Sequence, residues 1–312
     1  GDWERARKAI DAMPETLRSQ NRWRYWSARV ADQLGESAAA KQGYAAVMTT
    51  DNWYAVLSAA RLGKQFAPTF KPAGVSDAGM DRLAAEAPFV RARELALCDM
   101  QTEAIAEWRA GYDALEPAAQ IQAIGLAARW TWYLQAISAA AKLGVFDDYD
   151  LLYPRPYDTE VRRGSSLSGL PPDLVYAIIR QESLYRADAR SSADAIGLMQ
   201  LLPETARRTA KSWGLPAPSN SSLVIPSVNV PLGSAYLRSM LDRWQGQAPF
   251  AIASYNAGPG AVKRWLPAAP MATDVWVENI PYNETRTYVQ RVSWHRVVFG
   301  WIDERKPRYF SA

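Results

Sequence analysis

One carboxylate falls where the sequence predicts an apolar surface. Residues 171–183 are predicted to form a helix, because proline and aspartate at its start are typical of a first turn. At about 100° per residue the helix has one apolar stripe, formed by Leu174, Val175, Ile178 and Ile179. Glu182 falls in the middle of that stripe, where burial would raise its pKa toward that of a general acid. From this helix alone, a solvated glutamate at a fraying helix end is an equal alternative.

Two further motifs place polar groups at helix ends. Tyr255 and Asn256 precede Ala257 and Gly258, a pattern typical of a helix stop. The amide of Asn256 offers one acceptor and two donors, which suits an N-acetyl group. Glu284 lies in a predicted first turn, where the helix dipole stabilises its anion. We therefore expect a protonated Glu182 and an ionised Glu284, the arrangement that separates an acid from a non-acid role.

Taken together, four segments of the second half resemble the soluble lytic transglycosylase family, which cleaves peptidoglycan with a goose-type lysozyme-like catalytic domain. The segments are residues 180–183, 191–203, 253–260 and 278–286, and the resemblance covers roughly residues 165–300. Less specifically, residues 22–29 and 91–95 resemble the helical superhelix and linker region of that family.

The resemblance implies a role for each matching residue. Glu182 corresponds to the single catalytic acid. The implied substrate-binding residues are Ser191, Met199, Gln200, Leu202, Tyr255, Asn256 and Glu284. Two positions depart from the usual pattern. Asp194 replaces a residue that can adopt unusual φ angles, so the backbone geometry of the loop before Gly197 is in doubt. Leu202 replaces a methionine and should preserve the apolar wall of the site.

The implied activity is cleavage of the β-1,4 bond between N-acetylmuramic acid and N-acetylglucosamine, with a 1,6-anhydro end as product. A hydrolytic goose-type lysozyme and a non-catalytic cell-wall binding scaffold are the alternatives. The implied partners are peptidoglycan glycan strands and muropeptides, and the helical domain is a candidate binding surface for cell-wall synthesis or division proteins. The resemblance also implies a periplasmic monomer, and it implies no cofactor.

The composition of the 312 residues agrees with a globular protein, with 48% hydrophobic and 22% charged residues. The net charge of +4 is spread along the chain, which argues against a nucleic-acid partner. Cys98 and His295 are the single cysteine and histidine, so a disulfide, a zinc cluster and a histidine triad are excluded and no metal is expected. We expect Cys98 to be buried. No run of eighteen apolar residues occurs.

The helical pattern predicts a mainly α fold with at most a small sheet. We expect residues 1–150 to form a solenoid-like helical superhelix and linker domain. Its predicted helices span residues 21–34, 36–48, 51–62, 80–98, 102–115, 118–132 and 133–143. Its amphipathic opening suggests truncation at the N-terminus. The proline-containing residues 153–157 mark the boundary to a lysozyme-like catalytic domain over 151–312. Residues 163–169 are expected to be a flexible stretch.

Overall fold

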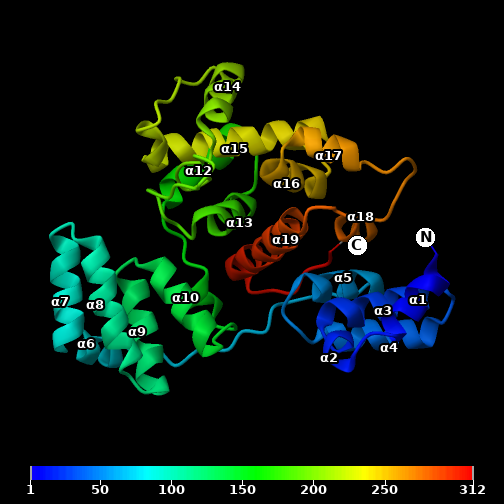
Figure 1. Ribbon diagram of the computed structural model, residues 1–312, viewed down its shortest axis with the longest axis horizontal. Coiled ribbons are helices and arrows are strands. Elements are labelled where there is room, and N and C mark those ends of the chain that lie inside the picture. Colours follow the sequence, from blue (N-terminus) through cyan, green and yellow to red (C-terminus); the bar gives the residue numbers. More distant parts are fainter. Residues whose placement is uncertain (1, 311–312) are drawn as a thin grey trace.

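The computed structural model describes residues 2–310, which form helices joined by turns and loops (Figure 1). Within this range no β-strand is present. Three isolated bridges occur instead, Phe66 with Arg308, Arg190 with Ile196, and Ile196 with Leu201. The prediction of a mainly α fold is therefore confirmed. None of the described helices combines the length and apolar character needed to span a bilayer.

The first helical group has an aromatic core of its own. Its helices are α1 (Trp3–Asp11), α2 (Glu15–Arg18), α3 (Asn21–Gln33), α4 (Ser37–Met48) and α5 (Trp53–Leu62). Tyr25 is completely buried among tyrosine and tryptophan rings. Gly43 lets α4 approach α3, because a Cβ there would lie 2.7 Å from that of Ala28. The helices predicted over residues 21–62 are confirmed to within two residues at each end.

The second helical group follows a loop over residues 64–76. It consists of α6 (Asp77–Ala84), α7 (Ala87–Leu97), α8 (Gln101–Asp113), α9 (Pro117–Arg129) and α10 (Tyr133–Leu143). The prediction of one helix over 80–98 is wrong, because α6 ends at Ala84 and a new helix, α7, begins at Ala87 with Pro88 in its first turn. The expectation of a buried Cys98 is wrong too. It caps the C-terminal end of α7 and is exposed.

The remaining helices form the third group, which carries the candidate site. They are α11 (Tyr149–Leu152), α12 (Asp158–Ser168), α13 (Pro172–Ser183), α14 (Pro203–Trp213), α15 (Pro226–Arg243), α16 (Ala248–Ala257), α17 (Pro259–Trp265), α18 (Thr273–Glu278) and α19 (Asn283–Glu304), with a 3-10 turn at Ser222–Val224. The flexible stretch expected at 163–169 is instead helical up to Ser168. Gly164 serves packing there, since a Cβ would lie 2.7 Å from Oγ of Ser234 on α15.

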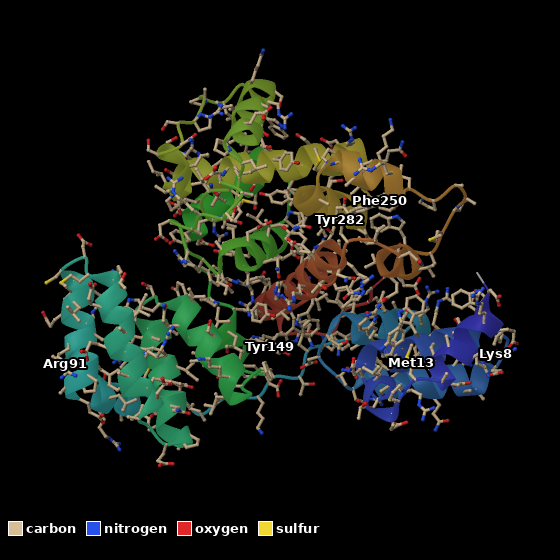
Figure 2. All side chains as sticks on the ribbon, in the orientation of Figure 1. Lys8, Met13, Arg91, Tyr149, Phe250 and Tyr282 are labelled. Carbon is tan, nitrogen blue, oxygen red and sulfur yellow. The ribbon has the colours of Figure 1, made fainter. Side chains whose placement is uncertain are left out.

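The long helix α19 packs against α5 of the first group and against α13 and α16 of its own group (Figure 1). Its end packs beside Tyr149, whose ring lies 6.4 Å from that of Trp294 and 5.9 Å from that of Trp301. The hydroxyl of Tyr149, which is labelled in Figure 2, donates to Asp51. Tyr149 thereby links the third group to the first. The second and third groups share one apolar core. The division into domains over 1–150 and 151–312 remains a prediction.

Candidate active site

Glu182 lies in the last turn of α13. Leu174, Val175, Ile178 and Ile179 are all buried, as the apolar stripe predicts. The helix is covered on its other side too, because Tyr176 and Arg180 are also buried. Glu182 itself is partly exposed. The carboxylate therefore projects from a buried helix into a space that solvent can reach.

One hydrogen bond reaches the Glu182 carboxylate. The hydroxyl of Tyr288, on α19, donates to Oε1 of Glu182 at 2.5 Å. Burial raises the pKa of Glu182 to about 7, with a further increase from the negative charge of Glu284 and an opposing decrease from the Tyr288 hydrogen bond. Near neutral pH this carboxyl is thus divided between its acid and base forms, as a group needs to be if it both donates and accepts a proton.

Glu182 opens onto a cavity of about 440 Å³ between α13, α16 and α19. Its lining consists of Gln181, Glu182, Asn256, Asn283, Glu284, Thr287, Tyr288 and Arg291. Three residues singled out from the sequence meet here, Glu182, Asn256 and Glu284. Asn256 donates to Oε1 of Glu284 at 3.3 Å and accepts from the hydroxyl of Thr285 at 2.6 Å. One wall of the cavity is therefore a fixed amide–carboxylate pair.

Four other residues singled out from the sequence lie on the loop between α13 and α14 and do not line this cavity. Ser191 accepts from the backbone N–H groups of residues 193 and 195, at 3.2 and 3.0 Å. Gln200 donates to the carbonyl groups of residues 189 and 197. Met199 is completely buried, and Leu202 is 45% exposed just before α14. In this structure Ser191 and Gln200 therefore brace the backbone of the loop, and Met199 anchors it in the core.

Tyr255, which precedes the cavity residue Asn256 on α16, bonds to that loop. Its hydroxyl donates to the carbonyl oxygen of Met199 at 2.8 Å. Burial raises the pKa of Tyr255 well above its usual range, and the negative charge of Glu182 adds to the effect. The phenol therefore stays protonated beside the carboxylate.

The loop keeps its shape despite the unusual Asp194. This residue adopts φ +61°, a left-handed conformation that aspartate tolerates better than most side chains. Gly197 has φ +82°, and a Cβ there would lie 2.3 Å from the carbonyl oxygen of Leu223. Glycine is thus required at position 197, whereas aspartate suffices at 194.

Sequence reasoning missed two residues of this region. Tyr288 lies four residues after Glu284 on the same face of α19, a spacing that could have indicated it. Asn229 is completely buried and holds the loop by three hydrogen bonds, from the N–H of Met199 and to the carbonyls of Ile196 and Leu223. A polar residue between Val228 and Val230 was the only available signal for Asn229.

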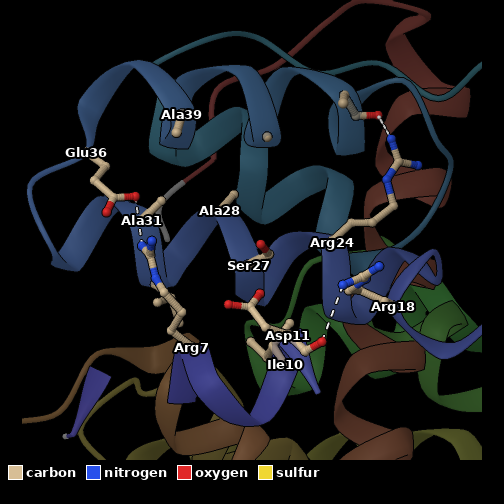
Figure 3. A pocket seen from close by; sticks show the side chains of 13 residues that line it. Arg7, Ile10, Asp11, Arg18, Arg24, Ser27, Ala28, Ala31, Glu36 and Ala39 are labelled. Atoms are coloured by element: carbon tan, nitrogen blue, oxygen red, sulfur yellow. Dashed lines mark hydrogen bonds and ion pairs between the residues drawn. The ribbon is translucent and has the colours of Figure 1, made fainter. Parts of the chain in front are cut away.

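Other cavities also hold acids. In one of about 700 Å³, burial raises the pKa of Asp51, but this carboxylate already accepts from the hydroxyl of Tyr149 and from the N–H of Thr69. Figure 3 shows one of about 400 Å³ between α1, α3 and α4, where Arg7 pairs with Glu36 at 2.8 Å. Within residues 2–310, no three His, Cys, Asp or Glu side chains are grouped so as to hold a metal ion. The site around Glu182 is therefore the candidate active site.

Two parts of the chain match known domains. Residues 161–274, which include Glu182 and Asn256, match the transglycosylase SLT domain. Residues 82–149 match the soluble lytic murein transglycosylase L domain. The fold and the site thus define a helical protein with an SLT domain beside an L domain. The chain belongs to the soluble lytic transglycosylase family, which confirms the resemblance predicted from the sequence.

Curated relatives and solved structures agree with this assignment. The soluble lytic murein transglycosylase of Escherichia coli K12 is 29% identical over 304 residues, covering 96% of this chain and 47% of the relative. A putative soluble lytic murein transglycosylase of Haemophilus influenzae is 30% identical, covering 97% of this chain and 50% of the relative. The chain therefore spans about half the length of the curated relatives it matches.

Among solved structures, an inactive mutant of the lytic transglycosylase Slt from Pseudomonas aeruginosa superposes with a TM-score of 0.89. It is 33% identical and covers 99% of this chain and 52% of its own. The 70-kDa soluble lytic transglycosylase of Escherichia coli gives the same TM-score at 28% identity, over all of this chain and 50% of its own. The predicted superhelix with a lysozyme-like domain is confirmed.

Proposed function

We propose that this chain is a peptidoglycan lytic transglycosylase with Glu182 as its single catalytic residue. It cleaves the β-1,4 bond between N-acetylmuramic acid and N-acetylglucosamine and leaves a 1,6-anhydro end. The observation that carries the proposal is the position of Glu182, which accepts from Tyr288 and lines one cavity with Asn256 and Glu284. Burial there raises the pKa of Glu182 to about 7. One carboxyl near its pKa can serve as acid and then as base.

The proposed reaction has two proton transfers through Glu182. In the first, the carboxylic acid donates its proton to the glycosidic oxygen, the bond from C1 to that oxygen breaks, and the glucosamine leaves with a free hydroxyl. In the second, the carboxylate takes the proton of the muramyl 6-hydroxyl as that oxygen bonds to C1. Glu182 ends protonated and no water is consumed. The attacking hydroxyl belongs to the same sugar, which gives it a high effective molarity.

The neighbours of Glu182 support these steps. The 2.5 Å hydrogen bond from Tyr288 stabilises the carboxylate formed by the first transfer and orients it for the second. Asn256 keeps one amide N–H beyond its bond to Glu284, and we assign that donor to the N-acetyl group of the substrate. The negative charge of Glu284 helps to keep Glu182 protonated before the reaction.

The remaining site assignments follow from the loop. Ser191, Met199, Gln200 and Leu202 are proposed to act on the glycan through the loop that they shape, and Tyr255 ties this loop to the cavity. The proposed partners are glycan strands and muropeptides in the periplasm. We propose that the protein acts on them as a monomer. The helical domain over residues 1–150 is proposed to shape access to the site and to offer a surface to cell-wall synthesis or division proteins.

Mass analysis of products released from purified sacculi tests the proposed reaction. A lytic transglycosylase releases anhydro-muropeptides, which are one water lighter than the products of a hydrolytic goose-type lysozyme. Products that carry the additional water would support the lysozyme alternative. If no muropeptides are released, the result would support a non-catalytic binding scaffold. One related solved structure is a complex with bulgecin A. Inhibition of release by bulgecin A would further support the family's activity in this chain.

A further inference from the structure

The short helix α18 directly precedes the segment that carries Glu284. It runs from Thr273 to Glu278 and lies between the catalytic helices and the first helical group (Figure 1). Its two acids, Asp274 and Glu278, are four residues apart and therefore share one face of the helix. Both acids pair with residues of α3 and α5.

Asp274 is buried in the first helical group. Its Oδ2 accepts from the hydroxyl of Tyr25 at 2.7 Å, from Nε of Arg29 at 3.0 Å and from Nη2 of Arg61 at 3.0 Å. The side chain has no exposed surface. Although burial opposes ionisation, the Tyr25 hydrogen bond and the two guanidinium charges lower the pKa of Asp274. The aspartate is therefore an anion fixed by donors from two helices.

Glu278 makes a second attachment one turn later. It accepts from Nε1 of Trp26 at 2.9 Å and from the hydroxyl of Tyr54 at 3.1 Å, and it forms an ion pair with Arg22. Tyr54 also accepts from the amide of Gln290 on α19, at 3.1 Å. The first helical group thus holds both α18 and the helix that follows it.

Only residues 279–282 separate α18 from α19, and this turn is braced. Nη1 of Arg286 donates to the carbonyl oxygens of Glu278 and Ile280, each at 3.3 Å. The same guanidinium bonds to the side chain of Asn283. Because the connection is short and tied at both ends, a shift of α18 is transmitted to Glu284.

We propose that Asp274 and Glu278 are positioning residues, which place Glu284 in the wall of the catalytic cavity by anchoring α18 to α3 and α5. The inference rests on the proposed function of the Glu182 site. It gives the first helical group a role in the reaction, although none of its residues lines the cavity around Glu182. The anchor acts through Glu284, and neither acid of α18 touches the substrate.

The consequence of a lost anchor is electrostatic. Glu182 accepts from the hydroxyl of Tyr288, and its charge raises the pKa of the buried Tyr255. It shares its cavity with the carboxylate of Glu284 and the guanidinium of Arg291. Glu284 raises the pKa of Glu182 through its charge. If the carboxylate of Glu284 moves away, the pKa of Glu182 falls. The fraction of enzyme with a protonated acid then decreases at neutral pH.

The test compares pH profiles of kcat/KM for anhydro-muropeptide release. The variants are Asp274→Asn, Glu278→Gln and Tyr25→Phe, and Glu36→Gln, which breaks the Arg7 ion pair between α1 and α4, is the matched control. We expect the alkaline limb to move to lower pH in the three anchor variants, by less than in Glu284→Gln, with kcat reduced about tenfold. In a Glu284→Gln background the anchor variants should move the limb no further.

Three outcomes would overturn the inference. One is an activity loss that matches the loss of folded protein while the alkaline limb stays in place. Another is a limb shift of the same size with and without Glu284. The third is unchanged kinetics in every folded variant. If Asp274→Asn does not fold, Glu278→Gln and Tyr25→Phe still decide. If the wild-type protein releases no anhydro-muropeptides, the proposed function itself is overturned. This outcome is distinguishable from the other three because it yields no pH profile to compare.

Discussion

The hydroxyl of Tyr288 donates to Oε1 of Glu182 at 2.5 Å, which joins α19 to α13 across 106 positions of sequence. This hydrogen bond and the burial of the carboxyl have opposite effects on the pKa of Glu182. Burial raises the pKa of Glu182, and the hydrogen bond lowers it. The resulting value of about 7 is the balance between them, so Tyr288 tunes the acid as well as orienting it.

We predict that Glu182→Gln abolishes anhydro-muropeptide release and leaves the fold intact. Glutamine keeps the shape of the side chain but cannot transfer a proton, and positioned acid–base groups contribute about 10²–10⁴-fold to rate. Because Glu182 serves in both transfers, we expect a loss at the upper end of that range. Product release from sacculi and circular dichroism check this. Glu204→Gln, an exposed acid on α14, is the control and should be fully active.

We predict that Tyr288→Phe moves the alkaline limb of kcat/KM to higher pH. The variant removes the donor that stabilises the carboxylate, so the pKa of Glu182 rises above its value of about 7. The loss of orientation should also lower kcat by about tenfold, because the carboxylate is then less well placed for the second transfer. A pH series of initial rates measures both effects. A limb that stays in place would show that the hydrogen bond is absent in solution.

The helices were predictable because their signals are local. Alanine and aromatic spacing, capping glycines and first-turn prolines gave most boundaries within a few residues. The errors arose where tertiary packing decides. Gly164 and the serines around it suggested a flexible stretch, yet Gly164 lies in a helix and packs closely against Ser234. The short helix α18 was missed because its two acids are stabilised by partners more than two hundred positions away.

The site shows the same division. Glu182 could be predicted because a carboxylate interrupts an apolar stripe, a pattern contained in one helix. Both the helix-end patterns and the family resemblance indicated Asn256 and Glu284, which do meet in the cavity. The resemblance could not tell which residues contact the cavity and which shape the adjoining loop. Gln200 and Ser191 bond to backbone groups of that loop, a distinction that depends on coordinates alone.

We predict that Asn229→Ala destabilises the protein by about 3 kcal/mol, since three buried hydrogen bonds are lost. The N–H of Met199 and the carbonyl of Leu223 would remain buried without this partner. The loop should loosen, and catalysis should weaken along with stability because Tyr255 is bonded to Met199. Thermal unfolding measures the change. Asn220→Ala is the control, because Asn220 is exposed and makes a single 3.4 Å contact with Arg207. An equal melting temperature for both variants would refute the role of Asn229.

The raised pKa of Glu182 also has a consequence for stability. In the unfolded chain the pKa of a glutamate is near 4.5, whereas in the fold burial raises the pKa of Glu182 to about 7. The folded state therefore binds the proton more tightly, so this site favours folding in acid and costs stability as the pH rises from about 4.5 through 7. At 1.36 kcal/mol per pKa unit, the full cost above pH 7 is about 3 kcal/mol. Glu182→Gln removes this cost, and we predict that it raises the melting temperature at pH 8 and leaves it almost unchanged at pH 4. The measurement is a melting series of both proteins across that range. A stabilisation that is constant with pH, or larger in acid, would mean that the Glu182 carboxyl is solvated and that its environment does not prepare it as an acid.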